Sequence, residues 1–515
     1  MATTTTNENT VTVMAPRQLH GRRQIFTEEK SITSENIRKV LNKALRVHNL
    51  NRSEIRYLQR YLRGVQPVLD RVKTANAEIN NKTVVNLASQ IVTFKTANFA
   101  GEPIQYVSRG SNVNVPGLVE QLNSMMLSEG KPSKDMELAK DMFTCGVGYR
   151  LILNDKAKDY LAGDLYDEAP FEIYTTEPAN SFIVRRNDVT KRVLMGVTYV
   201  FLDDAQTKVE YTVYTDDSTY TIIGSAQTVG EIKTVVKHNF GMVPLIEYAC
   251  NPIRMGAFEV VLPLLDAYSL LTANRIDGVE QFIQALMVFD GVDISRDEFL
   301  ELKTLGAIKL PKSTDGTSNA RRLYYLNEQL DQAQTQTLMD DIYDRLLQIV
   351  GMPSQGNANT SDSSNNGAMI IKSGQWDAQA RILETQGMWK SSDTESVKVV
   401  LRICHDADAL NELKVSDIEP KFGIHNYEDR LTKVQAFTTL IGSGCPPIQA
   451  FTLSGLSRDP EADAMAYEAY QEQQQSEQEQ SLMEEVNRAR TAALRSGRSS
   501  TSVSIEESGT EEQAS

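Results

Sequence analysis

Hydrophobic residues recur at helical spacing in the first part of the chain. Between residues 34 and 63 they predict two short helices separated at 48–51, where Asn51 and Glu54 resemble a capping pair. The same spacing predicts further helices at 82–99 and 116–144. The first of these two ends at a Gly and a Pro, which stop helices.

The period changes to two between residues 148 and 248. The segments there are rich in β-branched and aromatic residues and are separated by Asp, Asn and Gly turns such as Asp216–Asp217. This pattern predicts an antiparallel β domain.

After this domain the helical spacing returns over long stretches. A rod with two apolar stripes is predicted to reach about Phe289, a second long helix to cover 331–350, and further helices to cover 368–404 and 428–495. Two stripes on one helix are typical of an element packed between neighbours. A small insert at 290–330 separates the two long helices, and a polar loop at 354–367 follows the second. Together with the β domain, these helices predict an α+β fold.

Charge is unevenly distributed over the 515 residues. The formal net charge is −15, which excludes a generally basic protein that coats nucleic acid. Residues 1–60 carry eleven basic and five acidic residues, whereas 461–515 carry twelve acidic residues and four arginines. The two ends are therefore expected to face different surroundings.

Several protein classes are excluded by missing patterns. The four cysteines are far apart and form no CxxC pair, so no disulfide framework or zinc knuckle is predicted and a reducing cytoplasm fits. The N-terminus does not resemble a signal peptide and no apolar stretch reaches ten residues, so neither secretion nor a membrane partner is expected. The polar ends, 1–29 and 496–515, are predicted to be a disordered arm and tail.

Catalytic motifs are absent or weak. The sequence contains no GxxxxGK[ST], HExxH or EF-hand spacing, and its five histidines are scattered, so no cofactor or metal is predicted. Cys404 and His405 are adjacent, but neighbours on a helix point about 100° apart, which favours a structural pair. Asp340, Asp341 and Asp344 place carboxylates on one helix face and leave a metal-dependent nuclease as an alternative, although a salt-bridged face is the favoured interpretation.

Five local patterns, in this order along the chain, resemble the portal (head-to-tail connector) proteins of tailed double-stranded DNA bacteriophages with long non-contractile tails. They are RYLRGVQPVLDR (60–71), INNKTVVNLASQIVTFKTANFAGEPIQY (79–106), FGMVPLIEYACN (240–251), LLDAYSLLTANRIDGVEQF (264–282) and NNGAMIIKS (365–373). The chain departs from the family at Asn366, where Ser is common before the Gly.

The resemblance implies a mainly helical portal fold and assigns a role to each region. These roles are a disordered arm (1–29), a wing that is helical and then β-rich (30–256), stem helices (257–289 and 331–353), an α/β clip (290–330), a tunnel loop and tunnel helix (354–404), a wing return (405–449), a helical crown (450–495) and a disordered tail (496–515).

The resemblance also implies a function and partners. It implies a ring, usually of twelve copies, at one capsid vertex of the virion, assembled in the host cytoplasm. Double-stranded DNA would pass through the ring during packaging and ejection. The large terminase subunit, a head-tail adaptor protein, and the major capsid and scaffolding proteins would bind to it. The alternatives left open are another capsid shell or scaffolding protein and the nuclease named above.

A channel for DNA of any sequence needs weak contacts, because firmly neutralised phosphates would hold the duplex. The candidate channel residues come from the polar loop and the helix after it. They are Asn357, Asn359, Ser361, Asp362, Ser363, Ser364, Asn365, Asn366, Lys372, Arg381 and Lys390. Eighteen residues make five helical turns, so Lys372 and Lys390 share a face and Arg381 lies on the opposite one. One of these faces is expected to line the tunnel, and pairing with Asp377 or Glu384 is the alternative.

A basic cluster in the insert is the second candidate site. It consists of Lys303, Lys309, Lys312, Arg321 and Arg322. Contact with a partner through the clip and plain solubility are equally compatible with this cluster.

Overall fold

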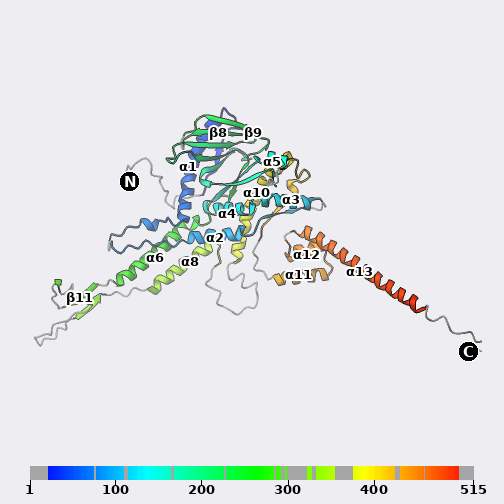
Figure 1. Ribbon diagram of the computed structural model, residues 1–515. Helices are drawn as coiled ribbons and strands as arrows, with labels where there is room; N and C mark the ends of the chain where they lie inside the picture. Colours follow the sequence, from blue (N-terminus) through cyan, green and yellow to red (C-terminus); the bar gives the residue numbers. More distant parts are fainter. Residues whose placement is uncertain are drawn as a thin grey trace, which may run out of the picture. The chain divides into compact units, whose positions relative to one another are not determined.

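The chain forms two compact units. The computed structural model describes residues 21–74, 77–109, 114–163, 168–225, 228–283, 286–290, 296–297, 322–326, 332–353, 375–423, 430–457 and 459–497. Within these ranges the first unit includes most of the chain up to Asn411, and the second consists of 105–123, 412–421 and the C-terminal helices. Figure 1 shows the elements along the chain.

A six-stranded sheet forms one core of the first unit. The strand order is β1-β5-β6-β7-β8-β9, and all pairs are antiparallel except β1 with β5. The strands are β1 (Ile25–Thr27), β5 (Ser181–Arg186), β6 (Val193–Phe201), β7 (Val209–Tyr214), β8 (Ser218–Gly224) and β9 (Ile232–Lys237). The predicted β domain is therefore present. The predicted disordered arm is wrong for residues 21–29, because they include strand β1, whereas residues 1–20 lie outside the described ranges.

Helix α1 (Ile37–Leu62) covers this sheet. Its buried residues Ile37, Leu41 and Leu45 pack against strand residues such as Val197 and Tyr211. The prediction of two helices is wrong, because α1 is continuous through 48–51. Asn51 and Glu54, which were predicted to cap a helix, bind the segment at Arg22 and Arg23 instead.

A three-stranded antiparallel sheet forms the second core of this unit. Its order is β10-β3-β4, with β3 (Val147–Leu153), β4 (Glu172–Thr176) and β10 (Leu245–Ala249). The long helix α10 (Gln375–Asp406) packs on β10 and β3, and the fully buried Trp389 of α10 lies 4.6 Å from the ring of Tyr248. Helix α4 (Lys131–Cys145) packs on β3 and β4 and also against α2 (Leu87–Ala100), whereas the short α5 (Ala157–Ala162) has no buried residue.

Glycines divide several segments that were predicted as single helices. The segment 116–144 forms α3 (Val115–Ser128) and α4, separated at Gly130, which has a φ of +66°. The segment 428–495 forms α11 (Arg430–Gly442), α12 (Pro447–Ser454) and α13 (Pro460–Gly497). A Gly and a Pro lie at each of these breaks, and both residues end helices.

The two predicted rods are the paired helices α6 (Leu262–Ile283) and α8 (Gln332–Val350). Helix α6 ends earlier than predicted, because Leu286–Asp290 form strand β11, which pairs antiparallel with β12 (Arg322–Leu326). Figure 1 shows α6 and α8 side by side, with β11 beyond their far ends.

The second unit is built from one strand pair and the C-terminal helices. Strand β2 (Gln105–Ser108) pairs antiparallel with β13 (Ile418–Lys421). Helices α11, α12 and α13 meet at Phe437, Phe451 and Tyr467, with the first two rings 4.4 Å apart. The side chains of α13 from Gln471 to Ala489 are all exposed.

The predicted α+β class is confirmed. In the described part of the chain, no helix is both long enough and apolar enough to cross a bilayer.

Candidate functional site

The α6–α8 pair presents apolar side chains to solvent. The inner face of α6 is buried at Leu265 and Ala273, and Tyr268 packs against Tyr343 of α8 at 6.1 Å between ring centres. Leu270, Ile276 and Val279 of α6 are 40 to 47% exposed, and Leu338 of α8 is 49% exposed. Ile276 and Val279 lie one turn apart and belong to the same predicted apolar stripe as the buried Leu265, so this stripe is only partly covered within the described chain. Leu270, nine residues before Val279, lies on the opposite side of the helix.

Polar contacts anchor the segment 66–81 along α6. Asp266 accepts a hydrogen bond from Tyr61 at 2.8 Å, and Asp277 forms ion pairs with Arg71 and Lys73, both at 3.0 Å. Burial raises the pKa of Asp277, but hydrogen bonds from Asn81 and Lys73 outweigh this effect and lower it to about 2. Asp277 therefore stabilises this anchor above about pH 4 and loses that effect as the pH falls toward 2.

The basic cluster of the insert is described only at its last residue. Arg322 is the first residue of β12, in register with Asp290 of β11. Lys303, Lys309, Lys312 and Arg321 lie outside the described residues. Clip contact by this cluster therefore stays a prediction.

Most of the predicted channel residues also lie outside the described ranges. These are Asn357, Asn359, Ser361, Asp362, Ser363, Ser364, Asn365, Asn366 and Lys372. Arg381 and Lys390 are on α10, and both have partners. The Nη1 of Arg381 donates to the carbonyl oxygen of Ile349 at 2.7 Å, so this side chain caps the C-terminal end of α8. The predicted alternative partners of Arg381 were Asp377 and Glu384, and the observed one is a backbone carbonyl on another helix.

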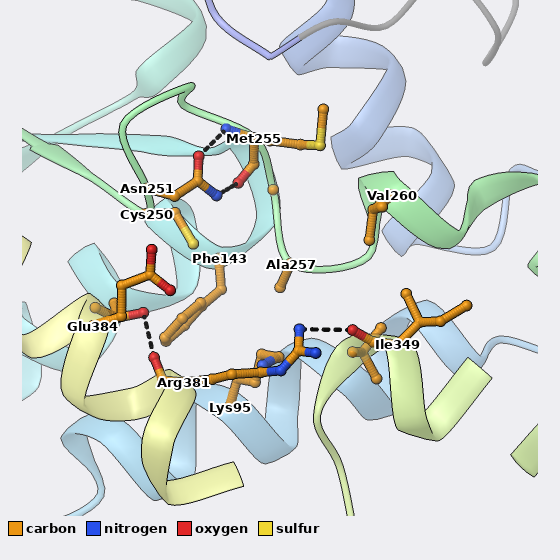
Figure 2. A pocket seen from close by; sticks show the side chains of 13 residues that line it. Lys95, Phe143, Cys250, Asn251, Met255, Ala257, Val260, Ile349, Arg381 and Glu384 are labelled. Atoms are coloured by element: carbon orange, nitrogen blue, oxygen red, sulfur yellow. Dashed lines mark hydrogen bonds between the residues drawn. The ribbon is translucent and has the colours of Figure 1, made fainter. Parts of the chain in front are cut away.

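A cavity of about 200 Å³ lies at this junction of α8 and α10. Figure 2 shows Arg381 reaching across it toward Ile349, with Lys95 of α2 below and Cys250 and Glu384 on the other side. Gly351, with a φ of +67°, ends α8 beside it, and a Cβ at that position would lie 2.3 Å from Cδ of Arg381. Gly351 therefore permits the close approach of Arg381.

Buried ion pairs fix α10 on the three-stranded sheet. Arg150 of β3 is buried, and its Nη1 lies 3.2 Å from Oδ1 of Asp393 on α10, while its Nη2 pairs with Asp135 of α4. Tyr248 donates to the same Asp393 oxygen at 3.0 Å. These contacts position α10, whose residue Arg381 forms the junction with α8.

A second buried cluster holds the segment after residue 20. Arg22 pairs with Glu54 at 3.2 Å and with Glu259 at 2.7 Å, and Arg23 pairs with Glu54 at 2.8 Å. Asn51 exchanges two hydrogen bonds with the backbone of Arg23. This binding explains why Asn51 and Glu54 do not interrupt α1.

Sequence reasoning missed both clusters and Lys95. A signal existed for Arg150, because it is the only charge in the strand VGYRLIL and a charge in an otherwise apolar strand implies a buried partner. No local signal identifies Lys95 or Arg22, because their surroundings come from segments far away in the sequence.

The candidate enzymatic residues lie in ordinary structural contacts. Asp341 pairs with Arg345 at 3.5 Å, Asp340 accepts from Gln336 at 2.6 Å, and Asp344 also has a partner. Within the described ranges no three His, Cys, Asp or Glu residues are grouped to hold a metal. Burial raises the pKa of Cys404 to about 12, and Nε2 of His405 hydrogen-bonds to the Leu410 carbonyl at 3.0 Å, so the pair is not arranged as nucleophile and base.

Comparison with known protein families decides the class of this chain. The family model described as "Phage portal protein, SPP1 Gp6-like" matches residues 41–480. The chain belongs to the phage portal protein family. The resemblance seen in the sequence is confirmed, and as a portal-family protein the chain is a structural component of the virion.

The chain was also compared with curated proteins and with solved structures. A search of curated proteins finds no significant match. Among solved structures, the chain is similar to one titled "Neck of empty GTA particle computed with C6 symmetry", at 9% identity and a TM-score of 0.42, over 73% of this chain and 91% of that chain.

Proposed function

We propose that this portal-family chain forms a closed ring at one capsid vertex, through which double-stranded DNA is packaged and ejected. The observation that carries the proposal is the apolar face of the α6–α8 pair, which no described residue covers, in a chain of this family. A rod buried by its own chain on one side and apolar on another fits a head-to-tail contact with the next copy. A copy number of twelve follows from the family resemblance.

The remaining regions take the roles that the resemblance implies. The polar segment 354–367 and α10 line the tunnel, and the insert between α6 and α8 binds the large terminase subunit and later the head-tail adaptor. The acidic segment 461–515 belongs to the crown, facing the stored genome, while the basic N-terminal segment faces capsid or scaffolding proteins. A net charge of −15 suits a channel that must not hold DNA.

The ring is tested by native mass spectrometry and negative-stain microscopy of the purified full-length protein. We expect rings with a central hole about the width of duplex DNA, and monomers or open shells would contradict the proposal. The double variant Ile276→Glu with Val279→Glu places charges on the uncovered face, and we expect it to dissociate the ring into folded subunits.

Val189→Glu is the matched control, because Val189 is 99% exposed on a turn of the first unit. This variant should keep the ring. If Ile276→Glu with Val279→Glu also keeps it, the α6 face is not the contact between copies.

A further inference from the structure

Two cations line the cavity between α2, α8 and α10, and one of them, Lys95, has no acceptor within the described chain. Its apolar wall includes Phe143 and Val260, while Lys95 and Arg381 bring charged groups to it. A cavity with both apolar and charged walls selects a ligand by charge as well as by size.

Lys95 is the less satisfied of the two cations. Within the described chain its ammonium forms no hydrogen bond and no ion pair. Burial lowers the pKa of Lys95 from its usual value, Cys250 acts in the opposite direction, and the positive charge of Arg381 lowers it further. The two cations thus line one cavity, with Lys95 half-buried and Arg381 exposed, and an anion bound between them would offset their repulsion.

Arg381 has donors to spare. One N–H is used on the Ile349 carbonyl, and a guanidinium carries five. Its position is fixed by this bond and by the close packing on Gly351. The remaining N–H groups are therefore preorganised beside the cavity.

The other polar groups of the wall are already occupied or face away. Asn251 hydrogen-bonds to the backbone N–H and carbonyl of Met255, and the Thr385 hydroxyl donates to the Arg381 carbonyl. Glu384 makes no ion pair with either cation, and in Figure 2 its carboxylate points toward Cys250, away from the Arg381 guanidinium. The wall thus provides donors to an anion and no carboxylate that already neutralises them.

We propose that this cavity binds a single phosphate-type oxyanion between the Lys95 ammonium and the Arg381 guanidinium. A tetrahedral oxyanion has enough acceptor oxygens for a guanidinium fork and an ammonium at once. The volume of about 200 Å³ has room for such an ion with a few waters and is below that of pockets for drug-sized molecules.

Occupancy would connect three elements. The bound oxyanion would join α2 to α10 beside the C-terminal turn of α8, at the two helix ends that flank residues 354–374. Free phosphate and a backbone phosphate of DNA share this chemistry. The inference concerns a site within one chain and does not depend on the proposed ring.

The test is thermal unfolding of the full-length protein against increasing inorganic phosphate, with chloride and acetate at equal ionic strength as comparisons. We expect a saturable rise in Tm with phosphate alone. Lys95→Met keeps the length of the aliphatic side chain and removes the ammonium, so it should weaken phosphate binding by about tenfold or more. Its Tm in chloride should stay equal or rise, because an unpaired charge is removed.

Lys398→Gln is the control, because Lys398 lies on the same helix α10 outside the cavity and pairs with Glu395 at 2.6 Å. It should respond to phosphate as the unmodified protein does. A short DNA duplex without terminal phosphates separates the sources: the same Lys95-dependent rise with the duplex identifies a backbone phosphate, and a rise with inorganic phosphate alone identifies the free ion. An equal response of Lys95→Met and the unmodified protein, or no phosphate response at all, would overturn the proposal.

Discussion

Arg150 shows how single residues hold the long helix of the first unit in place. Its guanidinium is buried between Asp135 of α4 and Asp393 of α10, and Lys131 adds a second cation to Asp135 at 2.5 Å. Breaking a buried pair costs more than forming it gains, because the remaining charge stays desolvated. The arrangement therefore fixes where α10 lies more than it adds to stability.

We predict that Arg150→Met lowers stability by about 3–5 kcal/mol, because it leaves Asp393 buried without its guanidinium partner. The urea midpoint measures the change. Arg192→Met, which breaks the exposed pair with Asp216 at 3.6 Å, should cost less than about 1 kcal/mol. Similar shifts for the two variants would show that burial does not govern these pairs.

A second residue-scale prediction concerns pH. Burial, followed by the charges of Glu177 and Glu137, raises the pKa of Asp141 to about 7, and Lys140 opposes this shift weakly. Because the folded-state pKa lies above the unfolded value, the protein loses stability as the pH rises from about 4 through 7. Asp141→Asn should remove this loss and be more stable than the unmodified protein at pH 8, by about 1–3 kcal/mol.

Thermal unfolding at a series of pH values checks this prediction. The difference between the two proteins should be small near pH 4 and constant above about pH 8. The stability of Asp141→Asn must be taken relative to that of the unmodified protein at each pH, because His48 has the opposite pH dependence in both. Burial and then Arg52 lower the pKa of His48 to about 3, so the protein gains stability from this group as the pH rises toward 6.5. If the stabilities of the two proteins changed in parallel with pH, Asp141 would not be the source of the loss of stability.

At the scale of elements, helix ends depend on single positions. Gly351 ends α8 in the left-handed region, and Arg381 packs where a Cβ would be. Both features require glycine, the first because side chains rarely adopt this φ and the second because of space. The geometry of the α8–α10 junction therefore depends on one residue without a side chain.

We predict that Gly351→Ala lowers stability by about 1–3 kcal/mol and weakens hydrogen-exchange protection in the last turn of α8. Gly163→Ala is the control, because Gly163 also follows a helix with a positive φ, of 74°, but has nothing within 4 Å of its Cβ position. It should cost about 1 kcal/mol. An equal cost for both would mean that Arg381 moves aside freely.

At the scale of the whole molecule, the proposed ring accounts for both the net charge of the chain and the apolar face of α6. Among the described residues nothing covers the apolar side chains Ile276 and Val279 of α6, whereas the chain as a whole is acidic. In the proposed ring, apolar contacts join neighbouring copies, and the net negative charge prevents tight binding of the duplex that passes between them. Isolated cations near the tunnel would then affect DNA movement more than ring stability.

We predict that Lys372→Ala combined with Lys390→Ala leaves ring assembly intact and lowers the amount of DNA packaged in an in vitro assay with assembled capsids. Arg381→Ala is a separate variant, because the observed bond to Ile349 gives Arg381 a structural role at the end of α8. Normal packaging by the triple variant would remove the channel role from all three residues.

The insert offers a second test at this scale. Lys303→Glu with Lys309→Glu and Lys312→Glu should abolish binding of the large terminase subunit to the ring while leaving the ring assembled, because an attractive basic surface becomes repulsive. Surface-immobilised rings and purified terminase measure this. Unchanged binding would assign the cluster to solubility.

The sequence by itself determined the class of fold, the alternation of helical and β segments and the portal family, because periodicity and local motifs are recorded in neighbouring residues. It also indicated the rod-like helices and a second apolar stripe on α6. It could not determine that Asn51 and Glu54 bind the segment at Arg22, or that Ile25–Thr27 pair with a strand more than 150 residues later.

The tertiary structure alone decided these pairings, and with them the cavity at Lys95 and Arg381. Each depends on groups from distant segments whose burial exists only once the chain is packed. Charge, desolvation and the fit around Gly351 are properties of that packing. This is why the candidate cations on α10 were named from the sequence, whereas their partners came only from the fold.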